Sequence, residues 1–417
     1  MQKVKGTQDI LPGESEIWQS IEQVLQEICR IYHFKEIRLP SIEYTEIFTR
    51  SIGEETDIVT KEMYSFTSGG GKSITLRPEG TAGIARCYSE NKIYGKESVS
   101  RWYYIGPMFR AERPQKGRQR QFHQFGIELI GSDSPYSDAE IILLNMDVFR
   151  KLGLKNLKLR INSVGNAHCR PQYVSALQDY FKDKTEKLCE QCKIRFEKNI
   201  LRMLDCKNPS CQEVLNSAPG IIEYLDEDSR RHFNSVIASL SGIDYTVDNR
   251  LVRGLDYYTR TVFEITSSDL GGQDALAGGG RYDNLIQAFS GKSIPAVGSA
   301  IGLERLIIAL TASSNLPEIK ENCDFYIAYF EDKHALRAFE TQKSLRSQGY
   351  SVRMNEGNKK IGNQLKEADR LGARFAVVIG DEELESGLFT LKNLKTGVQN
   401  TSVDMNFIIE AINNAPV

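Results

Sequence analysis

The sequence predicts an α+β protein in two parts: a large domain whose mainly antiparallel sheet is flanked by helices, and a small closing α/β domain. In the large domain, strand-like segments are joined by hairpin-like connections, which favours antiparallel pairing. A helical, cysteine-containing segment at 164–240 interrupts this pattern and is predicted to be an insertion. After residue 321, strands and helices alternate, as they do over parallel strands. We therefore assign residues 1–320 to the large domain and 321–417 to the small one.

The large domain opens with an amphipathic helix, because apolar residues recur at helical spacing between Glu14 and Tyr32. The following segment, EIRLP, is predicted to be a strand that ends at Pro40, since proline cannot donate to a ladder. The remaining strands are predicted from runs of apolar and aromatic residues. They span 63–66, 73–76, 102–109, 121–130, 157–161 and 261–265.

The small domain has three apolar strand segments, DFYIAYF, YSVRM and RFAVVIG, separated by helical patterns at 335–347 and around 361–371. This alternation predicts a doubly wound domain on parallel strands. A stretch with serines, an asparagine and a proline at 312–321 is predicted to be the linker between the domains. Such a fold names no function by itself.

The composition predicts a soluble globular protein of the cytoplasm. The chain has 417 residues, 40% of them hydrophobic and 26% charged, and a formal net charge of −2. Any nucleic-acid contact must therefore come from local patches. The amino terminus shows no apolar signal segment and no run approaches roughly 18 apolar residues, which argues against export and membrane insertion. The eight cysteines are expected to be reduced.

The segment Arg101–Ile130 is the most informative part of the chain. It contains two predicted strands joined by a loop of about ten residues, whereas ordinary hairpins use about two to five. Half of the loop is cationic, and these charges repel one another unless an anion joins them. The loop therefore predicts a polyanionic ligand. Its cations are Arg110, Arg113, Lys116, Arg118 and Arg120, against the single acid Glu112.

Three further clusters of polar residues accompany this loop. TLRPEGTAG begins at Thr75, and LVRGLDYYTRTVFE begins at Leu251, at the entrance to a predicted strand. The third joins AGGGRYDNL to AVGSAIGLERLIIAL, where Arg305 stands among apolar residues in a predicted helix. A guanidinium there must meet an anion, because burying it unpaired is costly. Gly298 and Gly302 allow a flat ligand to approach the backbone.

Together these segments resemble the class II aminoacyl-tRNA synthetases, and among them the histidyl-tRNA synthetase family, over nearly the whole chain. EIRLP and the helix before it resemble motif 1, FRAERPQKGRQRQFHQ resembles motif 2, and the predicted helix VGSAIGLERL resembles motif 3. RGLDYY and GGGRYD are similar to segments that set the histidine family apart within its class. The closing domain resembles the class IIa anticodon-binding domain.

The resemblance implies a histidine–tRNA ligase, which activates L-histidine with ATP and Mg²⁺ to histidyl-adenylate and pyrophosphate. The histidine then passes to the 3' end of tRNA(His). Arg110 and Arg253 would hold the α-phosphate from two sides. Arg305 would contact the far end of ATP, with Arg118 as a further ATP contact. Rigid guanidinium groups suit a step that concentrates negative charge and needs no protein nucleophile, so Arg110, Arg253 and Arg305 are the predicted catalytic residues.

The same resemblance implies a histidine pocket. A neutral imidazole has one donor and one acceptor nitrogen, so a selective pocket needs partners for both. Glu128 would accept from the ring and Tyr258 would supply its phenol, with Tyr282 close by. Strand alternation independently puts Gln124 and Glu128 on one face. The α-ammonium and carboxylate of histidine would be held by Glu79, Thr81 and Gln124.

The tRNA is predicted to meet the chain at two places, and motif 1 implies a C2 homodimer, because it forms the dimer interface in this class. The small domain would contact splayed anticodon bases, with Asn355, Lys359 and Lys360 as candidates at a strand–helix junction. By resemblance, the motif 2 loop meets the acceptor end. Its candidate contacts are Arg113, Gln115, Lys116, Arg118 and Arg120.

Plainer interpretations compete for several residues. Arg110 could pair with Glu112 in a purely structural role. Tyr257 is expected in the core more than in the pocket, because aromatic residues in strands usually pack. His123 lies on the strand face opposite Gln124 and is expected to be packed. GGGKS imitates the end of a phosphate-binding loop, but we interpret it as a hairpin tip.

Four cysteines of the predicted insertion have metal-ligand spacing, C-x₂-C-x₁₃-C-x₄-C. Two close pairs separated by a short loop are compatible with a tetrahedral structural zinc site. Four reduced thiols lining a helical insertion fit the same pattern, and the sequence does not decide between the two. The four are Cys189, Cys192, Cys206 and Cys211, whereas Cys29, Cys87, Cys169 and Cys323 are scattered.

Two other functions fit parts of the pattern. One is a catalytically silent synthetase paralogue that regulates the first enzyme of histidine biosynthesis. The intact Arg110, Arg253 and Arg305 and the full closing domain oppose it. The other is a class II synthetase for proline, threonine or glycine, which Glu128 and RGLDYY oppose. Histidine-dependent ATP–pyrophosphate exchange separates the three.

Overall fold

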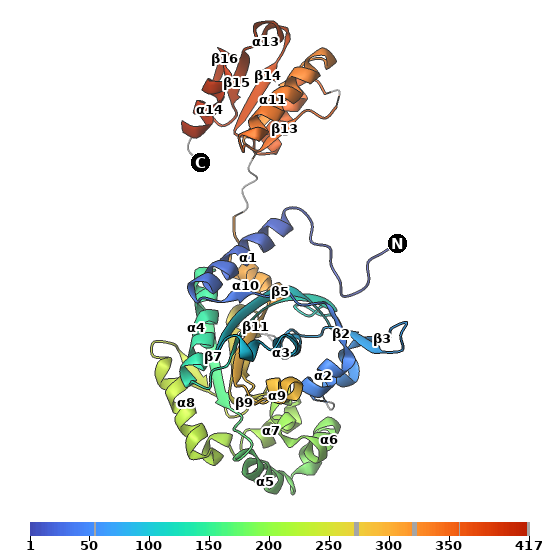
Figure 1. Ribbon diagram of the computed structural model, residues 1–417, viewed down its shortest axis with the longest axis vertical. Helices are drawn as coiled ribbons and strands as arrows, with labels where there is room; N and C mark the ends of the chain where they lie inside the picture. Colours follow the sequence, from blue (N-terminus) through green and yellow to red (C-terminus); the bar gives the residue numbers. More distant parts are fainter. Residues whose placement is uncertain (54–55, 271–274, 319–322, 358, 415–417) are drawn as a thin grey trace. The chain divides into compact units, whose positions relative to one another are not determined.

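The computed structural model divides the chain into two compact units, Met1–Pro317 and Glu318–Val417, each with its own core. The boundary falls inside the linker predicted at 312–321. Within the described residues, no helix is both long enough and apolar enough to cross a membrane. The described residues are 1–53, 56–270, 275–318, 323–357 and 359–414 (Figure 1).

An eight-stranded sheet forms the centre of the first unit, in the order β1-β5-β6-β11-β10-β9-β7-β8. Neighbouring strands are antiparallel except in the outer pairs β1–β5 and β7–β8, which are parallel. The predicted mainly antiparallel sheet is therefore confirmed. The strands are β1 (Lys35–Glu36), β5 (Ser100–Phe109), β6 (Gln121–Ile130), β7 (Leu157–Ser163), β8 (Tyr245–Val247), β9 (Thr259–Ser267), β10 (Ala275–Arg281) and β11 (Ala296–Gly302).

The two faces of this sheet have different roles, because side chains alternate along each strand. On β6, Phe125, Ile127 and Leu129 belong to the main core, together with residues of α1, α4 and α10. Gln124 and Glu128 alternate with them and lie on the opposite face, where α3 and α9 pack against each other. The flanking helices are α1 (Glu14–Ile31), α3 (Thr81–Glu90), α4 (Pro135–Lys151), α9 (Leu285–Ser290) and α10 (Leu303–Ala312).

Two of the predicted strands lie outside the large sheet. β3 (Tyr64–Thr67) and β4 (Ser73–Leu76) pair with β2 (Ile42–Tyr44) in a separate three-stranded sheet beside α2 (Thr45–Ile52). The GGGKS sequence lies at the β3–β4 hairpin, as predicted. The segment EIRLP contributes only its first residue to β1, so most of the strand predicted there is wrong.

The prediction of one helix over VGSAIGLERL is also wrong. Ala296–Gly302 forms β11, which pairs with β6 on one side and with β10 on the other, and α10 begins at Leu303. The pairing with β6 joins segments far apart in the sequence, and such contacts override a local helical pattern. Arg305 therefore lies in the first turn of a helix that follows directly on a central strand.

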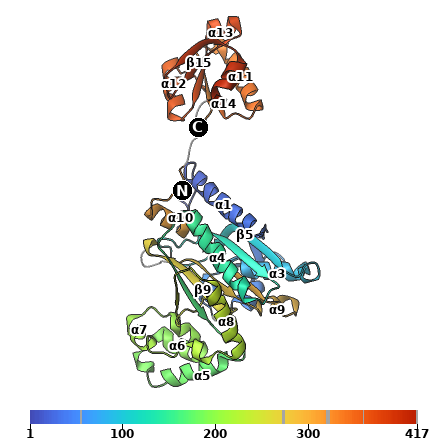
Figure 2. The same ribbon diagram turned by 90° about the vertical axis from the view of Figure 1, so that its left-hand side faces the viewer.

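The helical segment between β7 and β8 lies at one end of the first unit, away from α1 and α10 in both views (Figures 1 and 2). Its last helix, α8, packs against α4. Its apolar residues extend the main core, which joins the segment to the sheet. It contains α5 (Arg170–Phe181), α6 (Glu190–Lys198), the 3₁₀ helix η4 (Ile200–Asp205), α7 (Pro209–Leu215) and α8 (Glu227–Ser239).

The second unit has a five-stranded sheet in the order β13-β12-β14-β15-β16. Strands β13, β12 and β14 are parallel, as the strand–helix alternation predicts. Strands β15 and β16, which the sequence analysis did not predict, extend the sheet with antiparallel pairs. The elements are β12 (Phe325–Tyr329), α11 (Ala335–Ser347), β13 (Val352–Met354), α12 (Ile361–Arg370), β14 (Phe375–Ile379), α13 (Asp381–Ser386), β15 (Phe389–Asn393), β16 (Gln399–Val403) and α14 (Met405–Asn414).

Candidate functional site

A cavity of about 360 Å³ opens on the sheet face that carries Gln124. Its walls come from segments far apart in the sequence: the start of α3, the loop between β5 and β6, the loop before β9, strands β10 and β11, and the start of α10. The fold thus gathers most of the predicted site into one place. The predicted residues that line the cavity are Glu79, Thr81, Arg110, Arg118, Gln124, Arg253, Tyr258, Tyr282 and Arg305.

Two of the cavity arginines come from the long β5–β6 loop. Arg110 donates from Nε to the carbonyl oxygen of Pro78 at 2.9 Å, and its guanidinium lies 5.2 Å from the ring centre of Phe122. Glu112, the sequence-based alternative partner of Arg110, pairs instead with Arg118 at 3.2 Å. The contacts of Arg110 orient its charge without cancelling it, because a carbonyl and a ring are neutral.

Two further predicted arginines of the cavity come from later segments, Arg253 from the loop before β9 and Arg305 from the first turn of α10. Arg253 donates from Nη1 to Glu264 at 2.8 Å, while its Nε is buried and has no hydrogen-bond partner within the described chain. Gly278 on β10 makes room for this guanidinium, because a Cβ there would overlap it. Arg305 donates from Nε to the carbonyl oxygen of Gly117 at 3.0 Å. This bond ties α10 to the motif 2 loop.

Glu128 lies beneath the cavity with only 1% of its surface exposed. Thr81 donates to it from Oγ1 at 2.8 Å, and the Tyr282 hydroxyl donates to its other oxygen. Burial raises the pKa of Glu128 to about 8, although both hydrogen bonds favour the charged form. Gly298 stands opposite it on β11, and a Cβ there would overlap the carboxylate.

Two more polar groups occupy the same face. Glu79 is 4% exposed and accepts the backbone N–H groups of Thr81 at 2.7 Å and Ala82 at 2.8 Å, which caps the start of α3. Burial raises the pKa of this carboxyl. Gln124 faces Gly302 on β11, and its Oε1 is buried without a partner among the described residues. A buried acceptor of this kind calls for a ligand donor.

Three tyrosines form an aromatic wall. The ring of Tyr257 lies 4.7 Å from that of Tyr258 and 5.7 Å from that of Tyr282. Tyr257 is 8% exposed and belongs to a core cluster, yet it also lines the cavity. Tyr257 therefore lies in the core, as expected, and also forms part of the pocket wall. His123 is packed as expected, with its ring 5.0 Å from Trp18 and its Nδ1 3.0 Å from Glu304.

The remaining residues of the motif 2 loop do not share one environment. Arg113, Gln115 and Lys116 are exposed and stay candidates for RNA contact. Arg120 is half-buried, and its N–H donates to the carbonyl oxygen of Gly6 at 2.7 Å. A Cβ at Gly6 would crowd the Arg120 side chain, so the amino-terminal segment packs closely on this loop. Arg120 is accordingly the weakest of the five candidates.

In the second unit the three predicted anticodon contacts differ in their exposure and in their partners. Asn355 is only 3% exposed, so the interpretation of its side chain as a base contact is wrong for this conformation. Lys359 forms an ion pair with Glu367 at 2.7 Å. Lys360 is exposed at the start of α12. Only the two lysines remain available to RNA.

Sequence reasoning missed a contribution of the insertion to the cavity. Arg195 of α6 and Arg202 and Asp205 of η4 lie on its wall. All three stand between the two cysteine pairs, and that position was the available signal. The four thiols themselves come together: one Sγ from each lies within 4.8 Å of the others. Cys29, Cys87, Cys169 and Cys323 are free cysteines elsewhere in the two units.

A buried ion network behind the cavity was also missed. Arg281 of β10 is 0% exposed and donates from Nε to Asp138 of α4 at 3.0 Å. His232 of α8 contacts the same carboxylate at 2.8 Å, and Arg281 also pairs with Asp283 at 3.1 Å. The network joins sheet, core helix and insertion. An arginine at the end of an apolar, glycine-rich strand was the sequence signal.

Comparisons with known proteins describe the same two parts. Residues 6–306 match the family model described as histidyl-tRNA synthetase, and residues 324–415 match one described as anticodon binding domain. The chain is 48% identical over 408 residues to the histidine–tRNA ligase of Halothermothrix orenii, covering 97% of each chain. It is 46% identical over 412 residues to that of Caldanaerobacter subterraneus, covering 98% of this chain and 99% of the relative.

A solved structure, described as apo histidyl-tRNA synthetase of S. aureus, superposes with a TM-score of 0.84 at 38% identity. The match covers 99% of this chain and 100% of that one. Because the identity to ligases runs through both units, it favours the enzyme over the silent paralogue and over a synthetase for another amino acid. The resemblance predicted from the motifs is confirmed. The chain therefore belongs to the histidyl-tRNA synthetase family.

Proposed function

We propose that this chain activates L-histidine with MgATP and transfers the histidine to the 3' end of tRNA(His). One observation supports this most strongly: six arginines, four of them predicted from the sequence, share a single cavity with a polar, aromatic-walled pocket. Clustered guanidinium groups repel one another unless an anion joins them, and a nucleoside triphosphate supplies several negative charges at once. The buried acceptors beside them suit a small zwitterion with a hydrogen-bonding ring.

In the first step, a carboxylate oxygen of histidine attacks the α-phosphorus of ATP. The new O–P bond replaces the bond to the β-phosphate, and pyrophosphate leaves with its Mg²⁺. Arg110 and Arg253 hold the α-phosphate from two sides, and Arg305 and Arg118 hold the far end of ATP. Positioning and charge neutralisation carry this step, because no side chain of the cavity has to form a covalent bond.

In the second step, a hydroxyl of the terminal ribose attacks the carbonyl carbon of the adenylate, and AMP leaves. The exposed side chains of the motif 2 loop hold the acceptor end, while the second unit holds the anticodon. Both contacts rely on charge and are weakened by salt. We further propose that the chain works in the cytoplasm as a C2 homodimer, as motif 1 implies.

Selection of histidine depends on Glu128, Tyr258 and Tyr282. Glu128 accepts the N–H of the imidazole, and Tyr258 meets the other ring nitrogen with its hydroxyl. Glu79, Thr81 and Gln124 hold the ammonium and the carboxylate. An amino acid without a ring donor leaves Glu128 without this partner, and the loss of buried hydrogen bonds discriminates strongly.

We expect the KM for histidine to fall about fivefold between pH 7 and pH 8, because the Glu128 carboxyl ionises near pH 8 in the empty site and only its charged form accepts fully from the ring. ATP–pyrophosphate exchange at several pH values measures this. Glu128→Gln should raise the KM and remove its pH dependence, while Glu90→Gln, an exposed carboxylate at the end of α3, should change neither. An equal slope in the wild type and in Glu128→Gln would contradict the role.

The same carboxyl also affects stability. Its folded pKa lies above the ordinary glutamate value, so between about pH 4.5 and pH 8 the folded chain holds a proton that the unfolded chain has lost. Stability from this group is therefore present at low pH and is lost as the pH rises through that window. Glu128→Gln should flatten this part of the profile in urea unfolding.

The decisive test of function is amino-acid-dependent exchange of labelled pyrophosphate into ATP. We expect exchange with histidine and none with proline, threonine or glycine. Exchange with another amino acid would reject the histidine assignment. No exchange with any amino acid, in protein that binds ATP, would favour the silent paralogue.

A further inference from the structure

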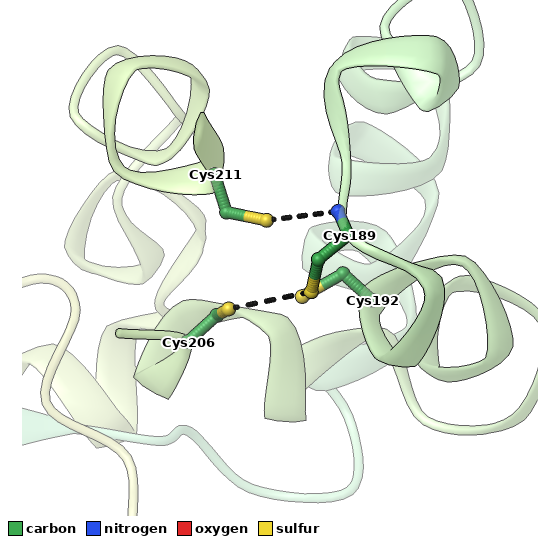
Figure 3. Close-up of side chains that lie close together, drawn as sticks. All are labelled: Cys189, Cys192, Cys206 and Cys211. Carbon is green, nitrogen blue, oxygen red and sulfur yellow. Dashed lines mark hydrogen bonds between the residues drawn. The ribbon is translucent and has the colours of Figure 1, made fainter. Parts of the chain in front are cut away.

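The insertion brings its four spaced cysteines to one point. Cys189 and Cys192 flank the start of α6, Cys206 follows η4, and Cys211 lies in α7. The Sγ atoms of Cys189 and Cys206 are 3.8 Å apart, and all four lie within 4.8 Å of one another (Figure 3). Three of the four side chains are buried and Cys189 is half-buried, which leaves a route for an ion to enter.

We propose that these four thiols bind one structural Zn²⁺, and that the ion fixes two arginines of the insertion at the wall of the catalytic cavity. Zinc–sulfur bonds of about 2.3 Å in a tetrahedron place sulfur atoms about 3.8 Å apart. The cluster is therefore already close to the size of a single-ion site. Four thiolates leave no open coordination position, so the role of the ion is structural.

The cluster fits zinc better than it fits two disulfides. A disulfide brings two sulfur atoms to about 2.05 Å and excludes the other two from that bond. The four cysteines do not divide into two pairs. The sulfur of Cys189 lies 3.8 Å from that of Cys206, and the backbone N–H of Cys189 donates to the sulfur of Cys211 at 3.2 Å. Figure 3 shows the side chains converging from three separate segments on one point. A backbone donor of this kind stabilises a thiolate.

The segment that this ion would close leads directly to the cavity. Between Cys192 and Cys206 lie Arg195 and Arg202, and both line the cavity wall. Arg202 donates from Nη2 to the carbonyl oxygen of Gly254 at 2.7 Å, directly after Arg253 in the chain. Its Nε also meets Asp256 at 3.3 Å.

Arg195 contacts the same segment and also the loop after α2. Its Nη1 donates to the carbonyl oxygen of Arg202 at 3.1 Å, and its Nη2 lies 3.7 Å from Asp57. The segment has few regular elements of its own, since η4 is a short 3₁₀ helix. A crosslink at both ends restricts such a segment in the same way as any loop closure. Arg202 thus acts as a positioning residue for the loop that carries Arg253. This part rests on the proposed function.

The metal itself is tested without any activity measurement. We expect the purified full-length chain to contain about one Zn²⁺ per chain by elemental analysis, with all eight thiols reduced. Replacing the zinc by Co²⁺ should give the intense thiolate-to-cobalt absorption of a tetrahedral site. Cys206→Ser should lose the ion, and Cys87→Ser, a half-buried cysteine outside the cluster, should keep it. A metal-free chain purified with zinc and reductant, or disulfides among the four cysteines, would overturn the site.

The coupling to the cavity needs a separate measurement. Arg202→Ala should raise the KM for ATP in pyrophosphate exchange about tenfold, with a smaller change in kcat, while zinc content stays at one. Chelated wild-type protein should show the same rise, and added Zn²⁺ should reverse it. Chelation of Arg202→Ala should add little. If zinc removal leaves the KM for ATP unchanged, the coupling is wrong even where the metal is present. If neither the wild type nor the variants show exchange, the proposed function is wrong. The zinc site is then still tested separately by the zinc content.

Discussion

Replacing Arg253 by alanine is expected to lower histidine-dependent ATP–pyrophosphate exchange by about 10²–10³-fold, the usual effect of removing one group that stabilises transition-state charge. The guanidinium lies on the cavity wall with its Nε buried and, within the described residues, without a hydrogen-bond partner. The carboxylate of Glu264 orients it by accepting a hydrogen bond from Nη1 at 2.8 Å. Histidine binding should remain detectable, because the pocket groups on β6 and α3 are untouched.

The control for this variant replaces an arginine that, unlike Arg253, is well exposed. Arg231→Ala removes the same charge from the surface of α8, where the side chain is 71% exposed and pairs across one turn with Asp228. Exchange by that variant should equal the wild type. Arg253→Lys keeps a charge but loses the planar fork, so it should recover only part of the loss. Unchanged exchange in Arg253→Ala would contradict the phosphate role of this residue.

Replacing Asp138 by asparagine is expected to lower the free energy of unfolding by about 3–5 kcal/mol, because it leaves a buried guanidinium without its main counter-charge. Asp138 and Arg281 are both 0% exposed, and His232 bonds to the same carboxylate. Urea denaturation measures the change. Asp228→Asn, which removes a 53% exposed carboxylate from the same region, should cost less than about 1 kcal/mol.

The pH dependence of this pair gives a second check. Burial raises the pKa of Asp138, but the charges and hydrogen bonds of Arg281 and His232 together outweigh it and hold the pKa below the ordinary aspartate value. Stability from this group is therefore present above that ordinary value and is lost as the pH falls through the folded pKa. The Asp138→Asn variant should lack this acid-sensitive part. Equal denaturation midpoints for the variant and the wild type would show that the network adds no stability.

The sequence predicts this fold best where a strand carries a regular alternation. The ends of β6 agree with the prediction at Gln121 and Ile130, because polar and apolar residues alternate along it. The prediction fails at β11, whose glycines and alanines form a strand only through pairing with β6 and β10. It also missed β15 and β16, since β16 is polar and mostly exposed and β15 alternates over only five residues.

The candidate site divides in the same way. The resemblance of several motifs to the synthetase family led to the prediction of Arg110, Arg253, Arg305 and the polar pocket, and the structure places these residues around one cavity. It could not show that Arg202 reaches the cavity, since that depends on how the insertion folds back on the loop before β9. The burial of Asn355 was equally invisible, because a strand–helix junction does not reveal which side chains turn inward.

The glycines of β10 and β11 have a consequence for the evolution of this fold. Gly278 leaves the volume that the Arg253 guanidinium occupies, and Gly298 leaves the volume of the Glu128 carboxylate. The positions of these two charged side chains therefore depend on the absence of a Cβ atom at each glycine. A descendant gene could keep every charged residue of the cavity and still displace the Arg253 guanidinium through one methyl group at position 278. Inventories of ionised side chains alone would then misjudge which copies in a genome are working enzymes.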